Sequence, residues 1–225
     1  MRIDSEKPVA LLGASPVSHE ILAEVLAFAP DLVAADGGAA LAIEAGVMPR
    51  AVIGDFDSLS DEVRRAVPAD RLFHVAEQDT TDFEKCLTRI NAPVILALGF
   101  TGRRLDHELA VYNAIVRHPA RSCVVVGDYD LALHVPERLE LDLPAGTRLS
   151  LFPMAEIAGR ATGLRWPIEG LAFSPSGRVG TSNAATGPVM LSFDRPGMLA
   201  ILPRSMLRQV LRALRVPGSA ASPGQ

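Results

Sequence analysis

The sequence predicts an α/β domain followed by an all-β domain, with the boundary near residue 130. Up to that point short apolar runs alternate with helical patterns, which is typical of βαβ units. After it come short strand-like runs that Pro and Gly interrupt, as in an antiparallel sandwich. The 225 residues are 48% hydrophobic and 21% charged, enough for a globular core. We therefore expect an N-terminal doubly wound, mainly parallel sheet with helices on both faces (1–130), a C-terminal antiparallel β-sandwich (131–216) and a disordered tail (217–225).

The strands of the first domain are expected to be buried on both faces, because their apolar runs are nearly continuous instead of alternating. These runs are 9–13, 32–36, 51–55, 71–75, 94–99 and 122–128. The segments between them carry helix-start signals, with Ser18, Ser58 and Thr81 as the expected N-caps. The expected helices are 18–29, 59–67, 81–90 and 105–117.

The second domain is expected to contain short strands, followed by one short amphipathic stretch at 205–215. No convincing helical pattern occurs between residues 131 and 203. The strand-like runs are 131–135, 139–143, 148–152, 189–193 and 198–202.

The overall composition argues against several classes of protein. The formal net charge of −4 is unfavourable for a general nucleic-acid-binding surface. No uncharged run reaches the roughly 18 apolar residues of a membrane span, and the apolar run that stops at Gly13 is no signal-peptide core. The two cysteines, Cys86 and Cys123, make no disulfide framework and have no metal-ligand spacing. We therefore expect a reduced, soluble, cytoplasmic protein without nucleic-acid or membrane partners.

Acidic residues are concentrated in one segment. Between Asp36 and Lys85 the chain has eleven acidic and five basic residues, whereas the remainder is slightly basic. Acid concentrated in one part of a near-neutral protein suggests a cation site rather than a solubilising surface.

Four polar clusters follow expected strands, where ligands of open α/β sheets bind. They are residues 36–38, 54–58, 78–85 and 99–107. If strands and helices alternate as expected, all four clusters lie on one rim of the sheet. Their convergence indicates a functional site more strongly than any single cluster does.

Asp55 and Asp57 are candidate ligands of Mg²⁺. Two aspartates separated by one residue can face one ion if the turn curls between them, and magnesium prefers carboxylates together with phosphates and waters. The alternative is that Asp57 or Ser58 only caps the next helix. The tripeptide at 36–38 is either a simple turn or a pair of glycines that let the backbone approach a phosphate or base.

Asp79, Thr81, Asp82 and Lys85 surround an expected helix start. Asp82 and Thr81 lie three and four residues before Lys85, so that all three can share a helix face. An exposed ion pair is one explanation. The chain has only two lysines against twenty arginines, however, and a compact ammonium beside an acidic cluster suits a phosphate.

The run 99–107 is a glycine-bearing loop that leads into a helix N-terminus, with Arg103 and Arg104 in the loop. Backbone N–H groups, the helix dipole and the arginines together indicate an anion site, while Asp106 fits the first turn as a cap. Neither GxGxxG nor a P-loop occurs. Carboxylates for a metal, a lysine and arginines on a sheet rim indicate phosphoryl or pyrophosphoryl transfer from a nucleotide.

In their order and spacing, the motifs resemble those of the thiamine pyrophosphokinase family over about residues 9–203. The motifs are DGGAA (36–40), GDFDS (54–58), D-x-T-D-F-x-K (79–85), G-x-x-G-x-R-x-D-H (99–107), TGLRWPIEG (162–170) and TSN (181–183). The resemblance implies transfer of the terminal diphosphate of ATP to the hydroxyl of thiamine, with Mg²⁺ as cofactor and AMP as second product. It also implies a homodimer in which the α/β domain of one subunit faces the β domain of the other.

The resemblance further implies a role for each matching residue. The implied catalytic residues are Asp55, Asp57, Asp82, Lys85, Arg104 and Asp106. The implied metal ligands are Asp55, Asp57, Asp79 and Asp82, with Asp36 nearby. The implied nucleotide contacts are Asp36, Gly37, Gly38, Thr81, Thr101, Gly102 and Arg103. The implied thiamine contacts are Gln78, Trp166, Ser182 and Asn183, with Trp166 offering an aromatic face to a planar cation.

Two positions depart from the family's motifs. Ala40 stands where the family often has Asn, and Arg103 replaces the second glycine of the loop.

Three other functions compete with the one that the resemblance implies. They are a pyrophosphokinase acting on a hydroxymethylpterin, a metal-dependent phosphohydrolase, and a non-catalytic thiamine or nucleotide sensor. The motifs at 162–170 and 181–183 favour thiamine over the pterin, and the intact metal set argues against a sensor.

Overall fold

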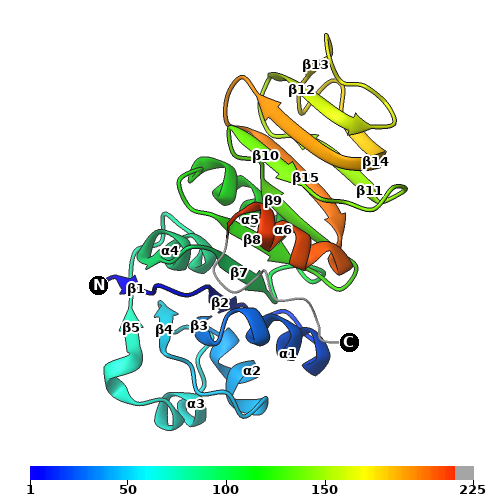
Figure 1. The fold of residues 1–225 in the computed structure, drawn as a ribbon. Helices are drawn as coiled ribbons and strands as arrows, with labels where there is room; N and C mark the ends of the chain where they lie inside the picture. The colour runs from blue at the N-terminus through cyan, green and yellow to red at the C-terminus, as the bar shows by residue number, and fades with distance from the viewer. Residues whose placement is uncertain (216–225) are drawn as a thin grey trace, which may run out of the picture. The chain divides into compact units, whose positions relative to one another are not determined.

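The structure is a computed structural model that describes residues 1–215; the expected tail 217–225 lies outside the described residues. The chain forms two compact units (Figure 1). Unit 1 comprises residues 1–114 and 125–128, and unit 2 comprises residues 115–124 and the chain from Tyr129 onward.

Unit 1 is built on a sheet whose strands pair in parallel. The sheet order is β8, β7, β2, β3, β4 and β5, and the pairs from β7 to β5 are parallel. Only the second half of β8 belongs to unit 1. The bounds are β2 Val9–Leu12, β3 Asp31–Ala35, β4 Ala51–Gly54, β5 Leu72–His74, β7 Ile95–Leu98 and β8 Cys123–Val126. Every residue of β2, β4 and β7 is buried, which explains their continuous apolar sequences. A separate parallel pair joins β1 (Ile3–Asp4) to β6 (Ile90–Asn91).

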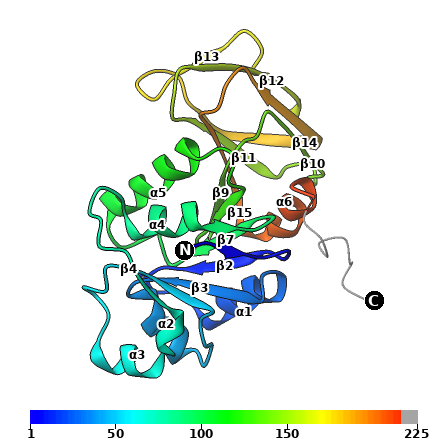
Figure 2. The same ribbon diagram turned by 90° about the vertical axis from the view of Figure 1, so that its left-hand side faces the viewer.

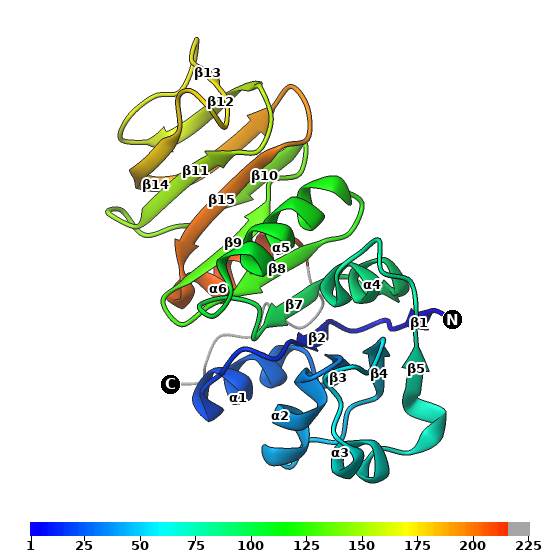
Figure 3. The same cartoon turned by 180° about the vertical axis from the view of Figure 1, so that it is seen from behind.

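Helices lie on both faces of this sheet (Figures 2 and 3). Helices α1 (His19–Phe28) and α2 (Gly38–Glu44) lie on one face, and α4 (Asp82–Arg89) lies on the other. The remaining elements are α3 (Asp61–Ala66), a 3-10 turn (Ala69–Arg71) and α5 (Leu105–Arg117). Because the strands are parallel, the loops that follow β3, β4 and β7 leave the sheet at one edge.

The local signals in the sequence locate most elements of unit 1. Each expected strand and each of the four expected helices is present within two residues of its expected bounds. Ser18 and Thr81 cap α1 and α4 by accepting the N–H groups of Ile21 and Glu84. The sequence did not predict α2, because the Asp-Gly-Gly turn runs directly into a helix that has no polar cap.

The expectation that Ser58 caps the next helix is wrong. Helix α3 begins at Asp61 and its N-cap is Ser60, which accepts the N–H of Val63. Phe56 has a left-handed backbone (φ 65°), and this turn directs Ser58 back toward the aspartates, where its hydroxyl donates to Asp57.

Unit 2 is an antiparallel β-structure organised around one long strand, β14 (Gly180–Phe193). The first part of β14 pairs with β11, and its second part pairs with β10 and β12. From β11 the pairing continues through β15 to β9, and from β12 it continues to β13. The bounds are β9 Asp130–His134, β10 Arg138–Leu141, β11 Arg148–Pro153, β12 Ile157–Leu164, β13 Ala172–Phe173 and β15 Met198–Pro203.

A 3-10 turn (Arg204–Met206) and α6 (Leu207–Ala213) occupy the stretch expected to be helical. Strands β12 and β13 and the first half of β14 were not expected from the sequence. Within residues 1–215 no helix is both long enough and apolar enough to cross a lipid bilayer.

Candidate functional site

A cavity of about 540 Å³ lies in unit 1, where the parallel strands end. All four predicted polar clusters contribute to its lining. The residues from these clusters are Asp36, Gly37, Asp55, Asp57, Ser58, Gln78, Thr80, Thr81, Asp82, Phe83, Lys85, Gly99, Phe100, Arg103, Arg104 and His107. Gly13, Ala14 and Ser15, which follow β2, complete that side of the cavity. Residues remote in sequence are thus brought to one rim of the sheet.

Three carboxylates form the acidic part of the cavity. Asp36, Asp55 and Asp57 each offer an oxygen, and these atoms all lie within 4.8 Å of one another. Asp36 is 3% exposed and follows β3, with a positive φ of 41° that turns it toward the end of β4. Its Oδ2 accepts the N–H of Ser58 at 3.2 Å, whereas its Oδ1 is buried without a hydrogen-bond partner. A buried, unpartnered carboxylate oxygen beside two further carboxylates fits a hard divalent cation.

The carboxyls of this group differ in their tendency to ionise. Burial, followed by the nearby charge of Asp82, raises the pKa of Asp36. The hydrogen bond from Gln78, followed by the N–H of Asp57, lowers the pKa of Asp55. The Gln78 amide donates to Asp55 Oδ2 at 2.9 Å. A bound cation would favour the charged form of Asp36, because it supplies the opposite charge that burial from water has removed.

Glycines allow the strands to approach closely behind the carboxylates. A Cβ atom on Gly54 would lie 2.7 Å from Cβ of Asp36, and one on Gly38 would lie 2.1 Å from the Leu12 carbonyl oxygen. The glycine at 38 therefore permits the packing of α2 against β2. It does not line the cavity, unlike Gly37.

Lys85 is buried in the wall of the cavity. Its side chain is 2% exposed, and Nζ lies 3.0 Å from Asp82 Oδ1 and 3.4 Å from Asp55 Oδ2. Burial is the largest influence on the Lys85 pKa and lowers it, but the two carboxylates together outweigh burial and raise the pKa overall. Burial, together with the nearby charges of Asp55 and Asp57, raises the pKa of Asp82 against the opposing effect of Lys85. The ion pair between Lys85 and Asp82 therefore has a buried lysine, and the alternative of an exposed surface ion pair is wrong.

The turn before α4 determines where these groups lie. Thr81 caps the helix through the N–H of Glu84 at 3.3 Å, so that Asp82 and Lys85 occupy its first turn. Glu77 closes the preceding turn by accepting from the backbone N–H groups of Asp79 and Thr80 and from the Thr80 hydroxyl. Asp79 is not among the residues that line the cavity. Neither Asp79 nor Asp82 belongs to the group of three carboxylates among the described residues.

The loop after β7 carries the two arginines. Gly99 has a φ of 76°, and its carbonyl accepts the N–H of Ser15 at 2.9 Å. Arg103 reaches the Ala14 carbonyl at 3.4 Å, and Arg104 forms an exposed ion pair with Asp106 at 2.7 Å. The side chain of Asp106 therefore holds Arg104.

Backbone support of this loop comes from a residue that the sequence did not suggest. Glu108 Oε2 accepts the N–H of Gly102 at 2.9 Å. Thr101, Gly102 and Asp106 are not among the residues that line the cavity. The only sequence signal for Glu108 was an acidic residue in the first turn of a helix that follows a glycine-bearing loop.

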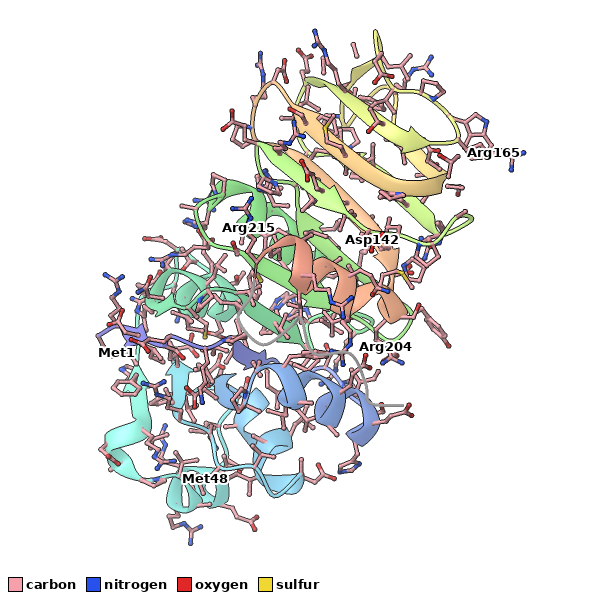
Figure 4. All side chains as sticks on the ribbon, in the orientation of Figure 1. Met1, Met48, Asp142, Arg165, Arg204 and Arg215 are labelled. Atoms are coloured by element: carbon pink, nitrogen blue, oxygen red, sulfur yellow. The ribbon has the colours of Figure 1, made fainter. Side chains whose placement is uncertain are left out.

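The expected thiamine contacts Trp166, Ser182 and Asn183 lie in unit 2. Trp166 is 52% exposed, and the Arg165 guanidinium lies 5.0 Å from the centroid of its ring; Arg165 points outward in Figure 4. Asn183 is buried, and its amide accepts the N–H of Trp166 at 3.1 Å and donates to the Trp166 carbonyl at 2.8 Å. Ser182 has a φ of 60°, and its N–H donates to the Ser150 hydroxyl. Asn183 thus holds the backbone of Trp166.

A parallel sheet with carboxylates, a buried lysine and an arginine loop at its rim is typical of proteins that bind a metal-complexed polyphosphate. Residues 22–126 match the family model described as "Thiamin pyrophosphokinase, catalytic domain". Residues 22–126, most of which belong to unit 1, are therefore similar to the catalytic domain of the thiamin pyrophosphokinases.

A curated relative supports this relationship over part of its length. The chain is 30% identical over 159 residues to "Thiamine pyrophosphokinase 1" of Oryza sativa subsp. japonica. The matched region covers 60% of this chain and 58% of the rice protein, so it spans less than two thirds of that relative.

Solved structures extend the likeness in fold to most of the chain. Thiamin pyrophosphokinase from Candida albicans has a TM-score of 0.75 at 15% identity, with 90% of this chain and 92% of that chain covered. The enzyme of the same name from Geobacillus thermodenitrificans has a TM-score of 0.71 at 24% identity, with 87% and 96% covered. At these identities the comparison establishes the fold.

Proposed function

We propose that the protein is a thiamine diphosphokinase, which transfers the terminal diphosphate of ATP to the hydroxyl of thiamine and releases AMP. The observation that carries the proposal is that the catalytic-domain match contains the three carboxylates, Lys85 and the arginine loop of the cavity. The named relative supports the same reaction.

Asp36, Asp55 and Asp57 would hold Mg²⁺, because their oxygens are close together and one of them is buried without a partner. Asp82 is the next candidate ligand, because Lys85 Nζ contacts both Asp82 and Asp55, and Asp55 belongs to the group of three carboxylates. Asp79 has the least support of the ligands that the resemblance implies. When bound, the metal would offset the triphosphate charge and the charge that develops at the attacked phosphorus.

Lys85, Arg103 and Arg104 would bind the phosphates. Lys85 is held as a cation by two carboxylates, so that its ammonium is fixed before the nucleotide arrives. Arg104 would exchange its exposed Asp106 partner for a phosphate, since an exposed ion pair contributes little to stability. Preformed positioning of this kind is the main contribution that in-line attack on phosphorus requires.

Trp166 would contact thiamine, because its exposed ring offers a face to a planar cation. Asn183 would position Trp166 through its two hydrogen bonds to the Trp166 backbone, and Ser182, the preceding residue, would line the same pocket. Gln78 would contribute near the phosphates, where its amide donates to Asp55.

The proposed function goes together with a proposed type of fold for each unit and a proposed homodimer. We propose that unit 1 is a doubly wound domain and that unit 2 is a β-sandwich, since β14 pairs with β11 in its first part and with β10 and β12 in its second. The expected domain limits 1–130 and 131–216 stay part of this proposal. A cytoplasmic homodimer is proposed from the family resemblance and from two unpaired cysteines.

Product analysis of purified protein with ATP, Mg²⁺ and thiamine tests the proposed function. We expect AMP and thiamine diphosphate in equal amounts, and no AMP when thiamine is omitted. AMP without thiamine diphosphate would instead indicate transfer to water, as in a hydrolase. AMP formed only after addition of a hydroxymethylpterin would indicate that other acceptor. Nucleotide binding without turnover would indicate a sensor.

The variant Asp55→Asn tests the cation site. We expect it to abolish turnover while the protein stays folded, and the exposed Asp70→Asn provides the matched control with the same chemical change. A near-normal rate for Asp55→Asn would contradict the metal assignment.

A further inference from the structure

We infer that Glu108 is a positioning residue for the nucleotide, which acts by fastening the arginine loop (residues 99–104) to α5. The inference rests on the proposed function and deepens it. Glu108 lies outside the cavity lining and outside the motifs of the sequence, so its effect has to pass through the loop.

Both oxygens of the Glu108 carboxylate are engaged. Oε2 accepts the N–H of Gly102 at 2.9 Å. Oε1 accepts the hydroxyl of Tyr112, one turn further along α5, at 3.0 Å. The N–H of Glu108 also donates to the Arg104 carbonyl at 3.0 Å. One residue therefore connects the loop, the helix start and the helix body.

The loop needs such a connection because Gly102 is otherwise poorly restrained. Gly102 has a φ of 78° and no atom within 4 Å of the position of a Cβ atom. Glycine has the widest choice of backbone conformations in the absence of a partner. Fixing Gly102 orients the next two residues, Arg103 and Arg104, which line the cavity.

Charge supports the same conclusion. A carboxylate close to an anion site would repel phosphate if its oxygens faced the ligand. In Glu108 these oxygens are turned to a backbone N–H and a phenol instead. Glu108 thus provides order to the loop, while Arg103 and Arg104 provide the positive charge.

The test compares Glu108→Ala with Glu108→Gln, because Gln can still accept the N–H of Gly102. Glu20→Ala, an exposed first-turn glutamate of α1, is the matched control. Calorimetric titration uses Mg²⁺ with α,β-methylene-ATP, whose bridge between the α- and β-phosphorus cannot release AMP. For Glu108→Ala we expect the affinity for α,β-methylene-ATP to fall about threefold to tenfold, because the variant loses about one net hydrogen bond that orders the loop. Glu108→Gln and Glu20→Ala should remain close to wild type.

Two further measurements separate positioning from general stability. In turnover assays the KM for ATP should rise in Glu108→Ala while the KM for thiamine stays constant. Hydrogen–deuterium exchange should accelerate in the peptide that contains residues 99–105. Unchanged nucleotide affinity in a folded Glu108→Ala protein would overturn the inference, as would an equal loss in Glu20→Ala.

The outcome also distinguishes this inference from the proposed function. If the wild type binds α,β-methylene-ATP but forms no thiamine diphosphate, the proposed function fails and the role of Glu108 is still decided by affinity. If the wild type binds no nucleotide, both fail. Should Glu108→Ala not fold, Tyr112→Phe replaces it, and weaker nucleotide binding is again the expected result.

Discussion

At the scale of single residues, the site depends on charges that the protein has removed from water. Lys85 and Asp36 are both buried at the rim of the sheet, one with two carboxylate partners and the other with an unpartnered oxygen. Removing an ion from water is costly unless partners compensate. Each of these residues is therefore placed for a ligand rather than for the stability of the fold.

Replacing Lys85 tests whether its charge serves the nucleotide. We expect Lys85→Met to fold, because Met fills a similar volume and the released Asp82 and Asp55 side chains are 32% and 15% exposed. Turnover should fall about 100-fold to 1,000-fold, as when a preorganised electrostatic contact is removed. Steady-state kinetics would measure this, with Lys7→Met, the other lysine and an exposed one, as control. Equal activity in the two variants would contradict the assignment.

Gly54 tests the close approach behind Asp36. In Gly54→Ala the new Cβ would meet Cβ of Asp36 at 2.7 Å, so the carboxylate should move out of the acidic group. We expect a weaker dependence on Mg²⁺ and a loss of about 1–3 kcal/mol in the free energy of unfolding. Gly46→Ala, where a Cβ meets nothing within 4 Å, should destabilise the protein through its positive φ without changing the Mg²⁺ requirement.

The residues of the site were predictable to different degrees. Asp55, Asp57, Asp82 and Lys85 could be found because their type and spacing are local features of the chain. Glu77 and Glu108 could not, because their function is to accept hydrogen bonds from turns, and such a carboxylate looks like any exposed acid in the sequence. The unpartnered oxygen of Asp36 depends on strands that are distant in the chain.

At the scale of elements, helix caps decide which groups reach the cavity. The sequence placed α1 and α4 well, because Ser18 and Thr81 are followed by apolar helical patterns. It placed the start of α3 two residues too early, because the turn at Phe56 has no recognisable sequence signal. In unit 2, β12 and the first half of β14 contain small and polar residues, and their pairing includes register shifts. Their pattern therefore does not alternate and was not recognised as strand, whereas the run 189–193 in the second half of β14 was expected.

Two caps of the same kind provide a matched test at this scale. Thr81→Ala and Ser60→Ala each remove a side chain that accepts the N–H of the third residue after it. Both variants should lose about 1 kcal/mol in the free energy of unfolding, measurable by urea denaturation. Only Thr81→Ala should also reduce turnover, because α4 carries Asp82 and Lys85 in its first turn whereas α3 carries no cavity residue. A similar loss of turnover in Ser60→Ala would contradict this distinction.

At the scale of the whole molecule, the order of the motifs was more informative than any of their individual geometries. Six motifs spread over both halves of the chain indicated a resemblance to the thiamine pyrophosphokinases, and the catalytic-domain match covers residues 22–126 of the same region. The topology of the strands then explains why clusters far apart in the sequence share one cavity. Parallel strands end on one side, and every polar loop of that side contributes.

The two cysteines report on the opening of two elements. Cys86 lies in α4 of unit 1, and Cys123 lies in β8, the strand that is divided between the two units; both are free and buried. Burial raises the pKa of each thiol far above its usual value, so the reactive thiolate is nearly absent in the folded protein. We expect no reaction with a disulfide reagent such as DTNB under native conditions, and reaction of both thiols in guanidinium.

Single-cysteine variants, Cys86→Ala and Cys123→Ala, then assign the reaction to one element. Each remaining thiol should react only as fast as the element that buries it opens, because labelling requires exposure to solvent. Labelling across a urea series should therefore follow the loss of helix for the Cys86 thiol in α4. A thiol that reacts rapidly in the native protein would contradict the burial of that element. Labelling of the two thiols at different urea concentrations would show that α4 and β8 open separately, whereas coincident labelling would show one cooperative transition.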